Sequence, residues 1–373
     1  MEKNIFSVYN IFRMWEIWNK YIFVQKGSWL KMKKNVYRIL IASIITLFVV
    51  ILVSSCIGAA DIKISEAFKI LINKIFNINL DISNIKTSTE TIIWKIRFPR
   101  ILVGLLVGGT LSVAGATYQG LLKNPMADPY VIGVSSGAAF GAAIGIASKI
   151  MFNFLGLSFT SIMAFICAVT VMLIVYKIAK IGNKVPITTL LLSGIAIGNF
   201  LTAFTSLIMI FAGDDLNKIF FWTMGSLSGK GWDQLISILP YVVIGIIIIY
   251  YYAKDLNIIL LGEDTASNLG VNVEKVKKIL LITSTIITAA VVSVSGIIGF
   301  IGLIIPHIAR MIVGPDNKAL IPVSFVFGAI LLIICDTISR SLLSQEIPVG
   351  LITSILGGPF FVYLLRIKKR EMN

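Results

Sequence analysis

The chain has 373 residues, of which 57% are hydrophobic and only 14% are charged. A soluble domain carries about 25% charged residues, so this composition excludes a soluble globular protein and indicates an integral membrane protein. The formal net charge of +15 is explained by Lys and Arg gathered in cytoplasmic loops, and we expect no nucleic-acid partner. Three scattered cysteines and a single histidine, His307, predict neither a disulfide framework nor a metal site.

Residues 1–35 form an N-terminal extension that contains Trp15, Trp18 and Trp29 among cationic and amide side chains. No apolar core in it is long enough for a signal peptide. Two interpretations remain open. The segment is either an interfacial amphipathic helix or the product of a misassigned start, because the sequence from Met32 onward is typical of the beginning of a membrane protein.

Residues 36–369 read as one all-α transmembrane domain. A run of about 20 apolar residues crosses the hydrocarbon core, and the chain offers ten such segments, at residues 36–58, 98–122, 129–147, 156–178, 185–212, 235–253, 279–296, 298–314, 319–338 and 348–366. The stretch 279–314 is divided because a single helix of that length would be far longer than the bilayer is thick. Gly296, Gly299 and Gly302 interrupt it.

The distribution of cations predicts the orientation in the membrane. Lys and Arg cluster before the first span, after the fourth, after the sixth and after the tenth, which places both termini in the cytoplasm. These residues are Lys31, Lys33, Lys34 and Arg38, then Lys177, Lys180 and Lys184, then Lys254, Lys275, Lys277 and Lys278, and finally Arg366, Lys368, Lys369 and Arg370. The entry to the second span, with Arg97 and Arg100 around Pro99, then faces outside, and Pro99 predicts an extended residue before it.

Small residues recur at four-residue spacing in several spans, as in Gly104/Gly108 and in the series 133, 137, 141 and 145. Such stripes favour close helix packing. An internal repeat is also visible, because Ser112–Gly115 and Ser293–Gly296 each precede a proline by ten residues. It relates the second span to the seventh, which run in opposite directions. An inverted repeat of this kind is typical of transporters.

The chain shows no means of powering transport by itself. The central parts of the ten spans lack Asp, Glu, Lys and Arg, although an ion-coupled secondary transporter, the alternative class, needs such groups inside the membrane. The segment 225–231 resembles a phosphate-binding loop but is one residue short and lacks the final Ser or Thr. We therefore expect no enzymatic activity and no bound cofactor, and we expect the energy to come from a cytoplasmic partner.

The cytoplasmic loop 254–278 is the candidate contact with that partner. Its segment 262–270 predicts a short helix with acidic residues in the first turn and Gly270 at its end. An exposed helix that presents Ala266 and Leu269 could insert into a groove of the partner. The loop could equally be a simple amphipathic connector.

Four long motifs occur in order along the chain: RFPRILVGLLVGGTLSVAGATYQGLLKNPMADPYVIGVSSGA, LGEDTASNLGV, GFIGLIIPHIARMIVGPDNKALIP and EIPVGLITSILGGPFFVYLLRIKK. They resemble the FecCD-type permeases of ABC importers, which take up iron–siderophores, haem and cobalamin. The resemblance implies ten helices per subunit and a homodimer with the path on the two-fold axis. It also implies two ATPase subunits, which bind the ATP, and an extracytoplasmic binding protein. Pairing with a sister permease in place of a second copy is left open.

The resemblance also implies roles for particular residues. Arg97, Arg100 and Arg340 match arginines that dock the binding protein, although Asp336 lies one turn before Arg340 and could instead pair with it. Around the short helix, the residues that match the ATPase-coupling segment are Gly262, Glu263, Ala266, Leu269 and Gly270. Thr188 and Thr189 match a cytoplasmic gate. The path would be lined by Asn124, Pro125, Gly133, Ser136 and Gly137, which could also serve packing.

These observations predict the permease subunit of an ABC importer in the plasma membrane, in contact with membrane lipids, that translocates an iron chelate or cobalamin. The sequence does not indicate which of these ligands is carried.

Overall fold

The computed structural model describes residues 35–371 apart from 59, 61, 79, 82–84, 155, 183 and 344, and it describes only the backbone of 363–371. The two interpretations of the N-terminal extension concern residues outside this range. The described chain is almost entirely helical. Its single β-hairpin pairs β1 (Asn153–Phe154) with β2 (Leu157–Ser158).

Ten apolar helices match the ten predicted segments, which confirms the predicted fold class. Seven are long enough to cross a membrane: Asn35–Cys56, Thr87–Leu121 with α4 (Phe98–Leu121) as its main part, α6 (Phe159–Ala179), α7 (Ile187–Phe211), α9 (Trp232–Tyr251), α12 (Val273–Ser295) and α14 (Asn317–Ser341). Three are shorter: α5 (Val134–Ala147), α13 (Ile301–Val313) and Val349–Val362 within α15 (Val349–Glu371).

The shorter helices α5 and α13 each follow non-helical backbone, at 122–133 and 296–300. The predicted division of 279–314 is confirmed, because α12 ends at Ser295 and α13 begins at Ile301. Gly296 makes the break with φ +70°, and a Cβ there would overlap the carbonyl of Trp222.

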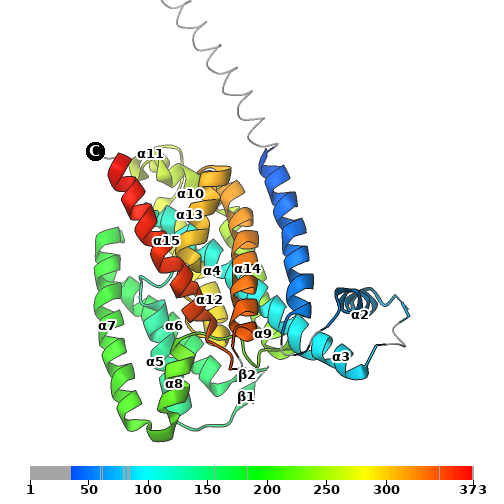
Figure 1. Cartoon of the computed structure of the whole chain (residues 1–373). Helices are drawn as coiled ribbons and strands as arrows, with labels where there is room; N and C mark the ends of the chain where they lie inside the picture. Colours follow the sequence, from blue (N-terminus) through cyan, green and yellow to red (C-terminus); the bar gives the residue numbers. More distant parts are fainter. Residues whose placement is uncertain are drawn as a thin grey trace, which may run out of the picture.

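Shorter elements cap the two ends of the bundle (Figure 1). One end carries α2 (Ile64–Phe76), α3 (Thr87–Thr91), α8 (Leu216–Thr223) and the hairpin, and we call it the hairpin end. The opposite end carries α10 (Ala253–Leu260), α11 (Glu263–Asn268) and the end of α15, and we call it the α11 end. A 3₁₀ turn, η2 (Gly213–Asp215), precedes α8, and a π-helical turn, η1 (Ile92–Arg97), precedes α4.

The core is built around α4, which packs against α12, α13 and α14. Within the chain, 89% of the apolar window of Thr87–Leu121 is buried, against 17% for Asn35–Cys56 and 17% for α7. The glycine stripes act as predicted, since a Cβ at Gly108 would overlap the Gly328 carbonyl and one at Gly141 would overlap the Met163 carbonyl. Such contacts allow the close approach of α4 to α14 and of α5 to α6.

The two copies of the short sequence repeat occupy different places. Ser112–Gly115 lies in the interior of α4, whereas Ser293–Gly296 ends α12. The order of the spans gives these two helices opposite directions, but the repeated residues mark different points along them. The inverted repeat stays a prediction.

Candidate functional site

Three arginines that the sequence analysis selected lie together at the hairpin end. Arg97 comes from the last position of η1, Arg100 from the first turn of α4, and Arg340 from the end of α14. All three guanidinium groups line one cavity of about 950 Å³, which Lys63 and Glu346 also line. The structure therefore brings together residues that are more than 230 positions apart in the sequence.

Arg97 is held by backbone carbonyl groups near the end of the first helix. Its Nη1 donates to the carbonyls of Ser55 at 2.9 Å and Cys56 at 2.8 Å, and its Nη2 donates to the carbonyl of Ala60 at 2.8 Å. Arg97 is only 6% exposed. Carbonyls at a helix C-terminus have no donor within the helix, so this arginine completes the end of the first helix.

Arg100 holds two carboxylates at once. Its Nε and Nη2 donate to Asp336 at 3.1 Å and 2.8 Å, in the fork geometry that suits a carboxylate. Its Nη1 donates to Glu346 at 2.9 Å. Burial alone would raise the pKa of Glu346, but the hydrogen bonds and charge of Arg100 hold that pKa below its ordinary value.

Arg340 shares Asp336 with Arg100. Its Nε lies 3.7 Å from Asp336 Oδ2, which is the pairing one turn apart that the sequence left open. Its Nη2 donates to the carbonyl of Ser54 and, at 2.9 Å, to the hydroxyl of Ser54. The Arg340 Nε makes no hydrogen bond to any residue that the structure describes. The N–H groups of the three arginines therefore mostly donate to acceptors within the chain. Glu346, which the sequence analysis did not select, belongs to the same cluster.

The entry to α4 differs from the sequence prediction. Phe98 was expected to be extended because it precedes Pro99, yet its φ of −62° and ψ of −48° are helical, so that prediction is wrong. The π-helical turn explains the difference: the Phe98 amide bonds to the Ile93 carbonyl five residues back, and Pro99, which has no amide hydrogen, directly follows this wider turn within the continuous helix Thr87–Leu121. A stiff entry is still formed, but it is helical throughout.

At the α11 end, the predicted short helix is confirmed as α11. Glu263 and Asp264 occupy its first turn, and Gly270 follows it with φ +86°. Lys277 of α12 fixes the helix through an ion pair to Glu263 at 2.5 Å. The expectation that Ala266 and Leu269 are both presented is wrong for Ala266, which is fully buried against the chain, whereas Leu269 is 63% exposed. Gly262 precedes α11 with φ +133°.

The predicted path residues divide into two groups. Gly133 and Gly137 pack against Val171 of α6, since a Cβ at either would lie within about 3.1 Å of that side chain. Ser136 donates to the Gly133 carbonyl at 3.0 Å and is half-buried. The remaining residues lie nearer the surface of the single chain. Thr188 and Asn124 are exposed, and Thr189 and Pro125 are half-buried.

One further group was not selected from the sequence. In the link 122–133, Asp128 accepts the Tyr130 amide at 2.9 Å, and the Tyr130 hydroxyl donates to the Ile298 carbonyl at 3.0 Å. This contact joins the link before α5 to the link before α13. Burial raises the pKa of Asp128 to about 6.

The bundle of long apolar helices is that of a multi-pass membrane protein. Residues 45–367 match the model of the FecCD transport family, and the chain belongs to that family.

Among its relatives, the cobalamin import system permease protein BtuC of Halobacterium salinarum is 43% identical over 281 residues, which cover 75% of this chain and 74% of the relative. The hemin transport system permease protein HmuU of Yersinia pestis is 39% identical over 300 residues, which cover 77% of this chain and 87% of the relative. A solved structure described as an inward-facing metal-chelate type ABC transporter aligns with a TM-score of 0.77 at 28% identity, covering 88% of this chain and 99% of that chain. The chain is thus the permease subunit of an ABC importer, and not an enzyme.

Proposed function

We propose that this permease carries an iron chelate or cobalamin across the plasma membrane, with both termini in the cytoplasm. The family match over residues 45–367 carries this proposal. Two copies would enclose the path, and two ATPase subunits would bind the ATP at the α11 end. The orientation is supported by the cations of the loop 254–278.

Leu269 supports the proposed ATPase contact. It is an exposed apolar side chain directly after α11, and the ion pair between Lys277 and Glu263 holds that helix in place. A large apolar side chain presented on a fixed short helix suits a socket on a partner protein. Glu263 is the carboxylate of this ion pair, and Gly262 forms the turn that precedes α11. Their part in coupling is therefore to position α11.

The arginine cluster is proposed to receive the binding protein by exchange of carboxylates. Arg100 has one buried partner, Asp336, and one partner at the edge of the cavity, Glu346, whose side chain is 42% exposed. A carboxylate of the binding protein could replace Glu346 and leave the bond to Asp336 intact. Arg97 and Arg340 would then supply positive charge around the incoming group, since both line the same cavity.

Reconstitution tests the proposed function. The purified permease should hydrolyse no ATP alone and should support hydrolysis and uptake once its ATPase and binding protein are added to proteoliposomes. Uptake of radiolabelled cobalamin, a ferric siderophore and haemin, each measured in competition with the others, identifies the ligand. Uptake that proceeds without the ATPase, driven by an ion gradient, would overturn the proposal.

A further inference from the structure

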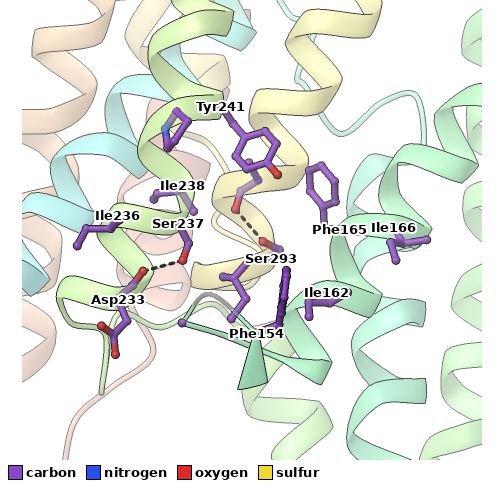
Figure 2. A pocket seen from close by; sticks show the side chains of 14 residues that line it. Phe154, Ile162, Phe165, Ile166, Asp233, Ile236, Ser237, Ile238, Tyr241 and Ser293 are labelled. Carbon is purple, nitrogen blue, oxygen red and sulfur yellow. Dashed lines mark hydrogen bonds between the residues drawn. The ribbon is translucent and has the colours of Figure 1, made fainter. Parts of the chain in front are cut away.

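A crevice of about 770 Å³ lies between α6 and α9, formed by residues other than those of the arginine cluster and α11 (Figure 2). Both helices pack on α12, whose Ala290 and Ser293 line the space between them. The β-hairpin closes the crevice at one end, because Gln234 of α9 donates to the Gly156 carbonyl at 3.0 Å. The crevice therefore has two walls, a floor and a closed end, all made by one chain.

The open side of the crevice lies on the apolar outer surface of the single chain. Both wall helices are candidate membrane spans, and only 33% of the apolar window of α6 and 28% of that of α9 are buried inside the chain. Ile166 and Ile236, at the rim, are 50% and 63% exposed. In a membrane, the medium in front of these side chains is hydrocarbon.

The lining is mainly apolar, and its polar side-chain groups are the Asp233 carboxylate at the closed end and the hydroxyls of Ser237, Tyr241 and Ser293. Ile162, Phe165 and Tyr241 contribute apolar surface, and the two aromatic rings lie 5.6 Å apart. The two serine hydroxyls donate to their own helices, Ser237 to the Asp233 carbonyl at 2.7 Å and Ser293 to the Ala290 carbonyl at 2.8 Å. A buried water needs two to four polar partners. An empty space of this size would forfeit the dispersion contacts of its whole lining.

The polar group at the closed end is anionic. Asp233 lies in the first turn of α9, is exposed, and has no ion-pair partner among the residues that the structure describes. Beside it, Trp232 donates to the Trp94 carbonyl at 2.9 Å and packs against the Trp94 ring. Tryptophans gather at the boundary between membrane and water, so Asp233 lies at the depth of lipid headgroups.

We propose that this crevice binds one acyl chain of a bilayer phospholipid whose amine-bearing headgroup pairs with Asp233. The charge of Asp233 favours phosphatidylethanolamine over the anionic phosphatidylglycerol. In the proposed orientation the lipid comes from the outer leaflet. Filling the space keeps α6 and α9 at a fixed separation on α12, independently of the ligand that the permease carries.

Photo-crosslinking tests this site. The full chain is reconstituted in nanodiscs of equimolar phosphatidylethanolamine and phosphatidylglycerol, with a trace of either lipid bearing a diazirine in its acyl chain, and adducts are mapped by mass spectrometry. The expected adducts fall on Ala290 and Ser293, because these floor residues, 3% and 2% exposed, lie beyond the reach of lipids at the outer surface. Exposed charge pairs are weak, so the phosphatidylethanolamine probe should be preferred by about 1.4- to fivefold.

Matched variants separate a bound lipid from surrounding lipid. Ser237→Trp, or Ile166→Trp on the opposite wall, fills the crevice and should remove the floor adduct. Ile244→Trp, at a 59% exposed position of α9 outside the crevice, should leave it unchanged. Asp233→Asn should equalise the two probes without loss of the adduct. The proposal is overturned if the wild-type protein shows no adducts on the floor residues, or if both filled variants keep an undiminished floor adduct. Each variant is first checked for monodisperse elution from a size-exclusion column.

Discussion

The guanidinium of Arg100 binds two carboxylates that differ in exposure, with Asp336 at 2% and Glu346 at 42%. If docking proceeds by exchange, Glu346 competes with the binding protein. Glu346→Gln should then raise the affinity for the binding protein by about 1.4- to fivefold, which is the range of an exposed charge pair. A titration of binding protein against the permease in nanodiscs at low salt measures this change.

The control for this variant is Asp336→Asn, which breaks a buried pair and should destabilise the permease by about 3–5 kcal/mol without improving docking. Unchanged affinity in Glu346→Gln would make the cluster a structural clamp and not a docking site. Reversing the charge of Arg97 or Arg100 is a poorer test. These side chains are 6% and 7% exposed, so the variants would bury unpaired carboxylates and lose the fold together with any docking.

Asp128 predicts a dependence of stability on pH. Burial raises the pKa of its carboxyl to about 6, while the amide of Tyr130 acts to lower it. Because the folded-state pKa is raised, the contribution of this group is favourable below the unfolded pKa near 4 and is lost as the pH rises through about 6. Asp128→Asn keeps an acceptor for the Tyr130 amide and removes the charge.

We expect Asp128→Asn to be more stable than the wild type at pH 7, by up to about 3 kcal/mol, and to show a flatter profile between pH 5 and pH 7. Thermal melts of detergent-solubilised protein, followed by size-exclusion chromatography across this pH range, provide the measurement. If the two proteins melt in parallel at every pH, the Asp128 carboxyl is already well solvated.

Contacts between residues close in the sequence could be predicted, whereas contacts between residues far apart in the sequence could not. The pairing of Asp336 with Arg340 follows from their spacing of one helical turn. The shorter contact of Asp336 with Arg100 joins residues 236 positions apart, and nothing in a single sequence indicates it. Phe98 was mispredicted for a different reason: the preference of a pre-proline residue is local, and the π-helical turn of a continuous helix overrides it.

At the scale of elements, α11 presents one apolar side chain and buries another. Leu269→Asp should reduce uptake and stimulated ATP hydrolysis at least about tenfold, because an unpaired charge in an apolar socket costs well over 1 kcal/mol. Asn268→Asp places the same charge on an exposed neighbour and should have little effect. Robust uptake by Leu269→Asp in proteoliposomes would remove Leu269 from the ATPase contact.

The contact between α4 and α14 depends on glycine. Gly108→Ala places a methyl group against the Gly328 carbonyl, and overpacking of this kind costs about 1–3 kcal/mol. Gly358→Ala in α15 is the matched control, because no heavy atom lies within 4 Å of the position that its Cβ would take. The first variant should lower the melting temperature and the second should not. Equal melting temperatures would show that the two helices can separate without cost.

The ten spans were predictable because hydropathy and length are properties of each segment alone. The amphipathic helix α2 was not predicted. Its short buried face of Ala67, Ile70 and Leu71 lies outside the ten long apolar segments. The glycine stripes indicated close packing but not the partner helices, since the pairing of α4 with α14 depends on the whole bundle.

At the scale of the whole molecule, charge within the spans is confined to their ends. Asp336 and Arg340 lie in the last two turns of α14, and Arg310 lies in the last turn of α13, where it donates to Gln119 at 2.9 Å. Among the described residues, the middle of the bundle contains buried hydroxyl groups but no charged side chains, and its helices are closely packed. This arrangement fits a permease whose energy is supplied from outside the membrane and not by titration of groups within it.

The N-terminal extension provides the last test, because it precedes the first span that the structure describes, Asn35–Cys56. Removal of residues 1–31 should leave insertion, orientation and uptake unchanged, since Lys33, Lys34 and Arg38 remain to hold the N-terminus in the cytoplasm. Protease accessibility of an N-terminal tag in inverted membrane vesicles reports the orientation of the first span, and uptake in proteoliposomes reports the activity. Replacing the three remaining cations with Gln in the truncated chain should scramble the orientation of the first span, which checks that the assay responds to charge. A truncated chain that fails to insert or to transport would show that the tryptophan-rich segment is a working part of the permease.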